Sequence, residues 1–407
     1  MTRLLRSRRA GVEQRATTLE LFFDLVFVFA VTQLSHALVE HLTWSGAVET
    51  LFLLLVVWWA WIYTTWMTNW FDPDSPVVRG VLIVVMLASL LMAVAIPEAF
   101  GDRAALFACS YVGLQVVRNV FAVLGSPRGS PLRATMTGIL AWSILIAPLW
   151  IGGAFLDHGE RWAIWLVALA VDYAGPYAGY WVPGRGRRIT TEWEIDSAHF
   201  AERFQLFIII ALGESIVVTG ATASALEIDL AHGSAIAVAF LSSAALWWLY
   251  FDYVATIAQR RLDLAEDRGR LARDAYTYLH IPMIAGIIVS AVGDELVIAH
   301  PSDSLSGAEL AAVVGGPALY LLGHVGFRLR MASSLSGKRL GAALACCAAG
   351  GVGVVLPALA TAALVLAILT VLIAAEMLSG SRRRSRGEPS PLEKLEQAAV
   401  TAQDDLG

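Results

Sequence analysis

The chain has 407 residues, of which 57% are hydrophobic and 15% are charged, and its formal net charge is −5. An average soluble domain carries about 25% charged residues. This composition, with a mean hydropathy of +0.65, excludes an ordinary soluble protein and favours a bundle of helices that spans a bilayer. Cys109, Cys346 and Cys347 lie in apolar stretches without a CxxC or Cys/His cluster, which argues against a disulfide framework or a zinc site.

Twelve apolar segments follow one another along the chain, each about as long as one transmembrane helix. They lie near 19–39, 47–70, 77–99, 104–124, 134–155, 161–182, 199–220, 233–257, 276–298, 308–327, 340–356 and 358–378. The first segment contains carboxylates and lacks a small-residue cleavage site, so it predicts a retained span and not a signal peptide. The sequence therefore predicts an all-α, polytopic transmembrane helix bundle of about twelve spans.

The positive charges support this segmentation. When the connections are numbered alternately, 27 of the 29 Lys and Arg residues fall on the side that holds both termini, and only Arg103 and Arg161 fall on the other. Lys and Arg are retained on the cytoplasmic side during membrane insertion. We therefore expect an even number of spans in the cell membrane, with both the N-terminus and the C-terminus in the cytoplasm.

An internal similarity divides the chain. The residues Phe23, Leu25, Ala30 and Gln33 correspond to Phe204, Leu206, Ala211 and Glu214 at a constant offset of 181. This pattern predicts a parallel repeat of two six-helix halves, 19–182 and 199–378; chance similarity between apolar helices is the alternative. The remaining parts are a basic cytoplasmic N-terminus (1–18), a cytoplasmic linker (183–198) and a disordered cytoplasmic tail (379–407).

Ionisable residues inside spans cost about 2.5–3.5 kcal/mol each to insert, so they usually face the bundle interior or water. In the first segment, Glu20 and Asp24 are four residues apart and share one helical face, and Gln33 follows further along. The functional interpretation is a face that handles ions or protons. The alternative is that Thr17 and Thr18 cap the helix and Glu20 is a first-turn carboxylate.

The second polar group comprises His199, Glu202 and Arg203, with Glu214 at mid-membrane depth as the deepest carboxylate. The alternative role for Glu214 is a structural hydrogen bond to a neighbouring helix. His199 and Glu202 are adjacent at i and i+3, but two ligands do not make a metal site, so we predict no metal and no cofactor.

A third set of polar residues is scattered along the chain and could partner the first two groups: Arg118, Asp172, Asp252 and His280. Arg118 is the natural counter-ion for a buried carboxylate. Interhelical hydrogen bonding or an interfacial position is the alternative role for these residues.

The stretch from Glu20 to Phe27 (ELFFDLVF), the aromatic second segment, and His199-x2-Glu202-Arg203-Phe204 leading to Leu212-Gly213-Glu214 form one combination. This combination resembles the bacterial low temperature requirement A family over roughly residues 15–378. By resemblance, the signature positions are Glu20, Asp24, His199, Glu202, Arg203 and Glu214. The resemblance implies an association with growth in the cold and no established molecular activity.

The leading functional hypothesis is a transporter or channel for a small solute or ion, because carboxylates lie inside spans and the sequence lacks Walker A, GxSxG, HExxH and dinucleotide motifs. One alternative is an intramembrane enzyme acting on lipids or isoprenoids, and another is a sensor or scaffold. The expected partners are the lipid bilayer and an unknown small solute or ion. The basic loops serve topology, so no nucleic acid is expected, and the oligomeric state is left open.

Overall fold

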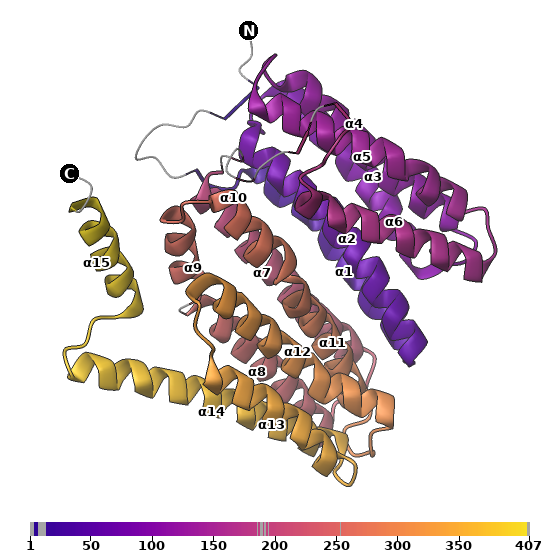
Figure 1. Cartoon of the computed structure of the whole chain (residues 1–407). Coiled ribbons are helices and arrows are strands. Elements are labelled where there is room, and N and C mark those ends of the chain that lie inside the picture. The colour runs from indigo at the N-terminus through magenta and orange to yellow at the C-terminus, as the bar shows by residue number, and fades with distance from the viewer. Residues whose placement is uncertain are drawn as a thin grey trace. The chain divides into compact units, whose positions relative to one another are not determined.

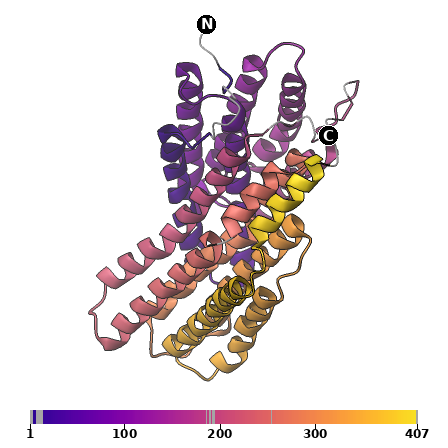
Figure 2. The ribbon, with the colours of Figure 1, turned by 90° about the vertical axis from the view of Figure 1, so that its left-hand side faces the viewer.

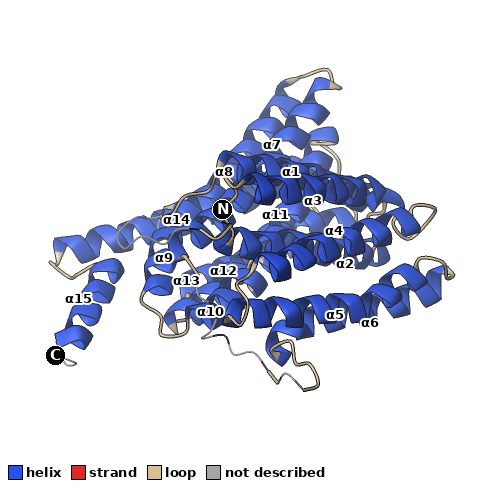
Figure 3. Ribbon diagram, turned by 90° about the horizontal axis from the view of Figure 1, so that it is seen from above, coloured by secondary structure: helices blue, strands red, loops and turns tan. Residues whose placement is uncertain are grey.

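The computed structural model describes residues 4–6, 14–184, 186–187, 190, 193, 195–252 and 254–404. Over these residues the chain consists of helices joined by loops and turns, with only isolated β-bridges such as the one between Leu5 and Phe71 (Figure 3). The predicted all-α class is therefore confirmed. The predicted basic N-terminus and the 183–198 linker fall partly outside the described residues.

The helices form two compact units, which are described separately. The first unit comprises Met1–His41, Ser45–Arg203 and Asp267–Arg273, and the second comprises Leu42–Trp44, Phe204–Glu266 and Asp274–Gly407. The long helix α7 (Ser197–Ser224) begins in the first unit and continues in the second. This division leaves the predicted repeat untested, and the repeat stays a prediction.

In the first unit, most of the helices pack side by side in a series (Figure 1). Helix α1 (Thr18–Glu40) packs against α3 (Pro76–Ala95), α3 against α4 (Ala104–Gly125), α4 against α5 (Pro131–Gly153), and α5 against α6 (His158–Ala178). A short 3-10 turn, η1 (Ile96–Glu98), ends α3 and contacts α1.

Helix α2 (Trp44–Trp70) is the central helix of this unit, because its side chains are buried on almost every face. Its tryptophans contact several helices at once: Trp61 reaches Asp24 on α1, and Trp59 stacks on Tyr173 of α6 with ring centroids 3.9 Å apart. The backbone carbonyl of Ala60 accepts a hydrogen bond from Arg118 on α4. The aromatic second segment therefore forms the core of the unit.

The second unit contains most of the remaining helices of the chain (Figure 1). They are the main part of α7, α8 (Leu230–Phe251), α9 (Val254–Asp263), α11 (Ile281–Ala299), α12 (Gly307–Ala332), α13 (Gly337–Gly353), α14 (Ala358–Ser385) and α15 (Pro391–Asp404). The short helix α10 (Arg268–Leu271) belongs to the first unit, and a π-helical turn (Ala272–Tyr278) begins in the first unit and ends in the second. The chain crosses back into the first unit over Asp267–Arg273.

Helices α11 and α12 approach each other closely through small residues. A Cβ atom added to Gly286 would collide with the backbone of α12 at Gly316 and Tyr320, and one added to Gly316 would collide with Ser290. Small residues let two membrane helices bring their backbones into van der Waals contact, which is the main attraction between helices in lipid.

Ten helices among the described residues are long and apolar enough to cross a membrane. Each of the twelve predicted segments coincides with a helix, and the boundary predicted at Pro357 separates α13 from α14. Helix α13 has only 17 residues, and α6 carries Arg161 and Asp172, so these two fall outside the ten. The structure thus supports a multi-pass bundle, and the count of twelve stays a prediction.

The C-terminal tail is more regular than the sequence suggested. We expected disorder over 379–407, but α14 continues to Ser385, and α15 is a separate helix at the yellow end of the chain (Figure 2). The cause is local: Glu393 Oε2 accepts a hydrogen bond from the backbone N–H of Ser390, and Ser390 Oγ accepts one from the N–H of Glu393. This reciprocal capping box starts a helix directly before Pro391.

Candidate functional site

The first turn of α1 is built around Glu20. Thr17 Oγ1 accepts a hydrogen bond from the backbone N–H of Glu20 at 3.3 Å, and Glu20 Oε2 accepts one from the N–H of Thr17 at 2.8 Å. This is a capping box, so the alternative interpretation of Glu20 as a first-turn carboxylate describes its backbone role. Its carboxylate is nevertheless buried, with 1% of the residue exposed, and it has further partners.

Arg6 is the first of these partners. Its Nη2 lies 2.8 Å from Glu20 Oε2, and its Nε donates to the backbone carbonyl of Thr68 at 2.7 Å. The segment that carries Arg6 is held by main-chain hydrogen bonds, from Arg6 N to Trp70 O and from Asp72 N to Leu4 O, both 2.9 Å. The N-terminal segment thus delivers a cation to the start of α1.

His199 is the second partner of Glu20, and its tautomer follows from the hydrogen bonds around it. The Asp196 N–H donates to Asn69 Oδ1, so Asn69 Nδ2 is the atom that faces His199 Nδ1 at 3.1 Å. Nδ1 must therefore accept, and the proton lies on Nε2, which donates to Glu20 Oε1 at 2.7 Å. The approach of Arg6 Nη2 to the same Nε2 at 3.1 Å is then a contact between two donors.

One helical turn deeper, Asp24 and Arg203 form a two-pronged ion pair. Arg203 Nη1 lies 2.6 Å from Asp24 Oδ2, and Nη2 lies 2.7 Å from Oδ1. Trp61 Nε1 donates to Asp24 Oδ1 at 2.9 Å, and its ring lies beneath the guanidinium at 5.7 Å. Both ionic side chains are almost fully buried. A bidentate geometry is the strongest form that an Arg–carboxylate pair takes.

These residues form one balanced cluster within the first unit, which we call the charge network: Arg6, Glu20, Asp24, Asn69, His199 and Arg203. With a neutral imidazole, its two guanidinium groups offset its two carboxylates. Glu202 lies at its edge, half-buried, and accepts a hydrogen bond from the Ala16 N–H at 2.7 Å. His199 and Glu202, three residues apart in the sequence, therefore bind different partners.

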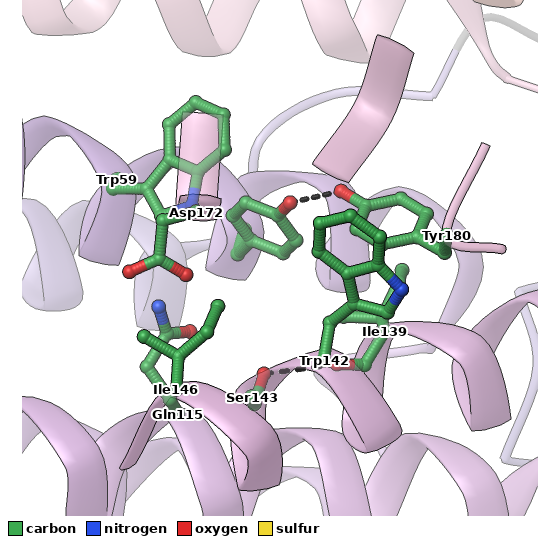
Figure 4. Close-up of a pocket in the computed structure, with 9 residues that line it drawn as sticks. Trp59, Gln115, Ile139, Trp142, Ser143, Ile146, Asp172 and Tyr180 are labelled. Carbon is green, nitrogen blue, oxygen red and sulfur yellow. Dashed lines mark hydrogen bonds between the residues drawn. The ribbon is translucent and has the colours of Figure 1, made fainter. Parts of the chain in front are cut away.

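A second polar region of the first unit surrounds a small cavity (Figure 4). Its aromatic lining comes from Trp59 and Tyr63 on α2, Trp142 on α5, and Tyr180 just after α6. The hydroxyls of Tyr63 and Tyr180 are hydrogen-bonded to each other. Ile139 and Ile146 of α5 complete the apolar wall.

Tyr180 reaches the cavity because the chain reverses sharply after α6. Gly179 and Tyr180 both have positive φ, 62° and 45°. This conformation suits glycine, but it is uncommon for a tyrosine and marks a strained position. The bare backbones of Gly138 and Gly175 leave room for the Tyr180 residue, since a Cβ at either glycine would crowd it. The turn is thus shaped to place this ring.

The polar side of the cavity is formed by Asp172, Gln115 and Ser143. Asp172 Oδ2 accepts hydrogen bonds from Tyr111 Oη at 3.0 Å and Trp150 Nε1 at 3.2 Å, while its Oδ1 accepts none from the described residues. Gln115 Nε2 donates to Tyr111 Oη at 3.0 Å, and the buried Gln115 Oε1 has no hydrogen-bond partner. The carboxylate of Asp172 therefore lies beside a space that the protein does not fill.

Arg118 is not bound to a carboxylate. Its Nη1 donates to the Ala60 carbonyl at 3.2 Å and to Thr64 Oγ1 at 3.4 Å, and its Nε donates to Asn119 Oδ1 at 3.3 Å. Its guanidinium lies over the Tyr63 ring, 5.1 Å from the centroid. Arg118, which was expected to pair with a buried carboxylate, thus contacts carbonyl, hydroxyl, amide and aromatic groups instead.

The other predicted site residues lie elsewhere. Gln33 is half-buried on α1, nine residues beyond Asp24, or about 13 Å along the helix axis. In the second unit, Glu214 is fully buried on α7 and Asp252 is exposed after α8. His280 is buried against Tyr276, and its Nε2 accepts a 2.9 Å hydrogen bond from Tyr250 while its Nδ1 faces the Ala275 carbonyl.

One ion pair of the second unit was not expected from the sequence. Arg339 binds both carboxylate oxygens of Glu376 at 2.9 Å, and its Nη1 donates to His324 Nδ1 at 2.7 Å. Glu376 is the only acidic residue of the last apolar segment, and that isolation is the sequence signal that could have revealed it. Arg6 and Asn69 gave no comparable signal in the sequence. Arg6 is one of several basic residues near the N-terminus that were explained by the membrane topology, and Asn69 lies near the end of a tryptophan-rich segment.

The long apolar helices and the buried charges define a multi-pass membrane protein of the helical-bundle class. Residues 15–374 match the model of the family described as bacterial low temperature requirement A protein, and the chain belongs to that family. It is also 39% identical over 322 residues to an uncharacterized protein of Rhizobium meliloti (strain 1021), covering 78% of each chain. No solved structure matches the chain.

Proposed function

We propose that this protein is a transporter or channel that moves a small solute or ion across the membrane. The observation that carries the proposal is the cavity of the first unit, where the buried Gln115 Oε1 has no hydrogen-bond partner and Asp172 Oδ1 accepts no hydrogen bond from the described residues. An unsatisfied polar group in a bilayer costs several kcal/mol, so a membrane protein that retains one beside a space lined by a carboxylate has a use for it.

The charge network supports a structural role for Glu20 and Asp24, in place of the ion- or proton-handling role considered from the sequence. Every oxygen of Asp24 is engaged by Arg203 or Trp61, and both oxygens of Glu20 are engaged by Arg6, Thr17 or His199. Groups so fully paired are poorly suited to take up and release a travelling ion. We therefore assign the network to holding α1, α2 and the start of α7 together.

The same contacts weigh against the enzymatic alternative. That alternative needs His199 and Glu202 as an acid/base pair or as metal ligands. His199 is bound on both ring nitrogens by Asn69 and Glu20, and Glu202 is bound to the backbone of Ala16. Neither side chain is then free to meet a substrate at a common point.

The test measures how fast a small solute or ion enters proteoliposomes that contain the purified protein. Asp172→Asn keeps the shape of the side chain and removes its charge, and it should reduce flux at least about tenfold, as expected when a charge-assisted hydrogen bond is lost. Asp252→Asn is the matched control, because that carboxylate is exposed at the end of α8. Equal flux in wild type and Asp172→Asn would remove the cavity from the proposal.

Glu214 is the second group to test, because it is fully buried in α7. If the transport is coupled to protons through Glu214, then Glu214→Gln abolishes the pH dependence of the flux while expression is retained. If Glu214 has only a structural role, the variant changes the thermal stability of the protein and leaves the pH dependence of the remaining flux unchanged.

We further propose that both termini lie in the cytoplasm. The support is the distribution of 27 of the 29 Lys and Arg residues on one side of the alternating connections. Alkaline phosphatase, which is active only outside the cytoplasm, should be inactive when fused after residue 407. An active fusion with an intact chain would reverse the proposed orientation.

A further inference from the structure

Two hydrogen-bond acceptors of the cavity wall accept no bond from the described residues: Asp172 Oδ1 and Gln115 Oε1. Several donors of the wall are already used. Gln115 Nε2 donates one N–H to Tyr111, Trp142 Nε1 donates to the Trp181 carbonyl at 2.9 Å, and Ser143 Oγ donates to the Ile139 carbonyl at 3.0 Å. An occupant that meets both free acceptors must supply donors or positive charge.

Gln115 gives the stronger evidence for an occupant of the cavity, because its free acceptor is buried. It is only 6% exposed, and it lines the cavity. Its amide orientation is set by the hydrogen bond from Nε2 to the Tyr111 hydroxyl, which itself donates to Asp172 Oδ2. The chain Gln115–Tyr111–Asp172 thus holds two acceptor groups at one space. A buried acceptor without a partner costs about 1–3 kcal/mol unless something fills the gap.

The aromatic rings narrow the class of occupant further. Trp59, Tyr63, Trp142 and Tyr180 line the cavity, and aromatic faces attract cations, ammonium groups in particular. The space is small: about 10 Å³ is open to the centre of a water-sized group, roughly what a single water needs. This size excludes a large organic cation and suits one as small as ammonium.

Arg118 sets the strength of binding. Its guanidinium lies over the ring of Tyr63, which lines the cavity. The positive charge of this guanidinium offsets part of the negative charge of Asp172. A cation in the cavity is therefore held by a partly compensated carboxylate. Weak binding of this kind fits a pathway, because a conducted ion has to leave its site as readily as it enters.

We propose that the cavity of the first unit binds a small ammonium-type cation, held by Asp172 Oδ1 and Gln115 Oε1 against the rings of Trp59 and Trp142. This inference rests on the proposed transport function and names its substrate class. It also explains why Tyr180 is held in a strained turn, since that ring closes the side of the cavity opposite Asp172 (Figure 4).

The test is a fluorescence titration of the purified full-length chain in detergent, since two tryptophans line the cavity. Ammonium chloride is exchanged for choline chloride at constant ionic strength, because choline is too large for the space. The wild type should give a saturable change with ammonium. Asp172→Asn and Gln115→Leu should each weaken the apparent affinity, by at least about tenfold and about fivefold, as expected from the loss of a charged and a neutral acceptor.

Asp252→Asn is again the matched control and should titrate like the wild type. If the wild type shows no saturable response, the cavity holds only water, and the inference is overturned without recourse to any variant. A saturable response that survives both Asp172→Asn and Gln115→Leu overturns it as well, because ammonium then binds elsewhere. Gln115→Leu keeps the test decisive if Asp172→Asn fails to fold.

The two proposals fail in different ways. If ammonium binds as described but methylammonium and ammonium do not cross proteoliposome membranes, the transport function is refuted and the binding site stands. If another solute crosses and Asp172→Asn stops it while ammonium gives no response, the transport function stands and the substrate class is wrong.

Discussion

The buried pair of Asp24 and Arg203 offers the sharpest test of how the first unit is held together. Asp24→Asn keeps the size of the side chain and removes its charge. The guanidinium of Arg203, which is fully buried, then loses a carboxylate at 2.6 and 2.7 Å. Leaving one member of a buried ion pair without its partner typically costs about 3–5 kcal/mol.

The structure places the expected loss at the lower end of that range. Glu20 Oε1 lies 4.0 Å from Arg203 Nε and remains as a second anion. An asparagine oxygen can still accept one of the hydrogen bonds from Arg203. We therefore expect Asp24→Asn to lower the free energy of unfolding by about 3 kcal/mol. The double variant Asp24→Asn/Arg203→Gln, which also removes the unpaired positive charge, should lose less in total, about 1 kcal/mol or less relative to the wild type.

The measurement is unfolding of the purified protein in mixed micelles with rising SDS, followed by tryptophan fluorescence. Asp252→Asn, an exposed carboxylate, should stay within about 0.5 kcal/mol of the wild type. The reasoning is refuted if Asp24→Asn costs less than about 1 kcal/mol, or if the losses of the two single variants simply add in the double variant. Additivity would mean that the two side chains do not stabilise each other.

Three further variants test other parts of the structure in the same unfolding assay. Asn69→Leu leaves Nδ1 of the buried His199 without a donor and should cost about 1–3 kcal/mol; no loss would mean that the imidazole does not hold the assigned tautomer. Gly316→Val forces a side chain into Ser290 and should cost about 1–3 kcal/mol by overpacking, and a stable variant would disprove the close helix contact. Gly179→Ala, at a φ of 62°, should cost about 1 kcal/mol, and a neutral result would contradict the left-handed turn.

Local features of the structure could be predicted from the sequence, because the physics that produces them is local. Hydropathy placed each of the twelve apolar segments on a helix, and the spacing Thr17-x2-Glu20 indicated a helix start before the capping box was seen. The tail is the local exception: we expected disorder there, but the capping box of Ser390 and Glu393 starts a helix.

The partners of the buried charges could not be predicted, because pairing depends on packing between distant segments. Glu20 meets residues 14 positions before it and 179 after it. Arg118 was expected to bind a carboxylate, but the fold offered it a carbonyl, a hydroxyl and an aromatic face. The cavity could not be predicted for the same reason, since nothing in the spacing of Tyr111, Gln115 and Asp172 shows that these three side chains lie beside one another.

The pairing in the charge network bears on whether α6 crosses the membrane. Glu20 pairs with His199 and Asp24 with Arg203, and both pairs span 179 residues. Residues four apart on α1 therefore meet residues four apart on α7 in the same order, so the two helix starts run in the same direction. Two such helices begin on the same side of the bilayer only if an even number of spans lies between their starts. Because α1 to α5 are all long and apolar enough to cross a membrane, we expect α6 to cross as well despite its charges.

Labelling of single cysteines in a chain without Cys109, Cys346 and Cys347 tests this directly. Arg128, His158 and Pro183 are exposed in the turns before α5, at the start of α6 and after α6. If α6 crosses, a membrane-impermeant maleimide reaches Pro183→Cys from the same side as Arg128→Cys and from the side opposite to His158→Cys. If Pro183→Cys is labelled together with His158→Cys instead, α6 does not cross. The parallel start of α7 would then have to be explained by a helix that enters and leaves on one face.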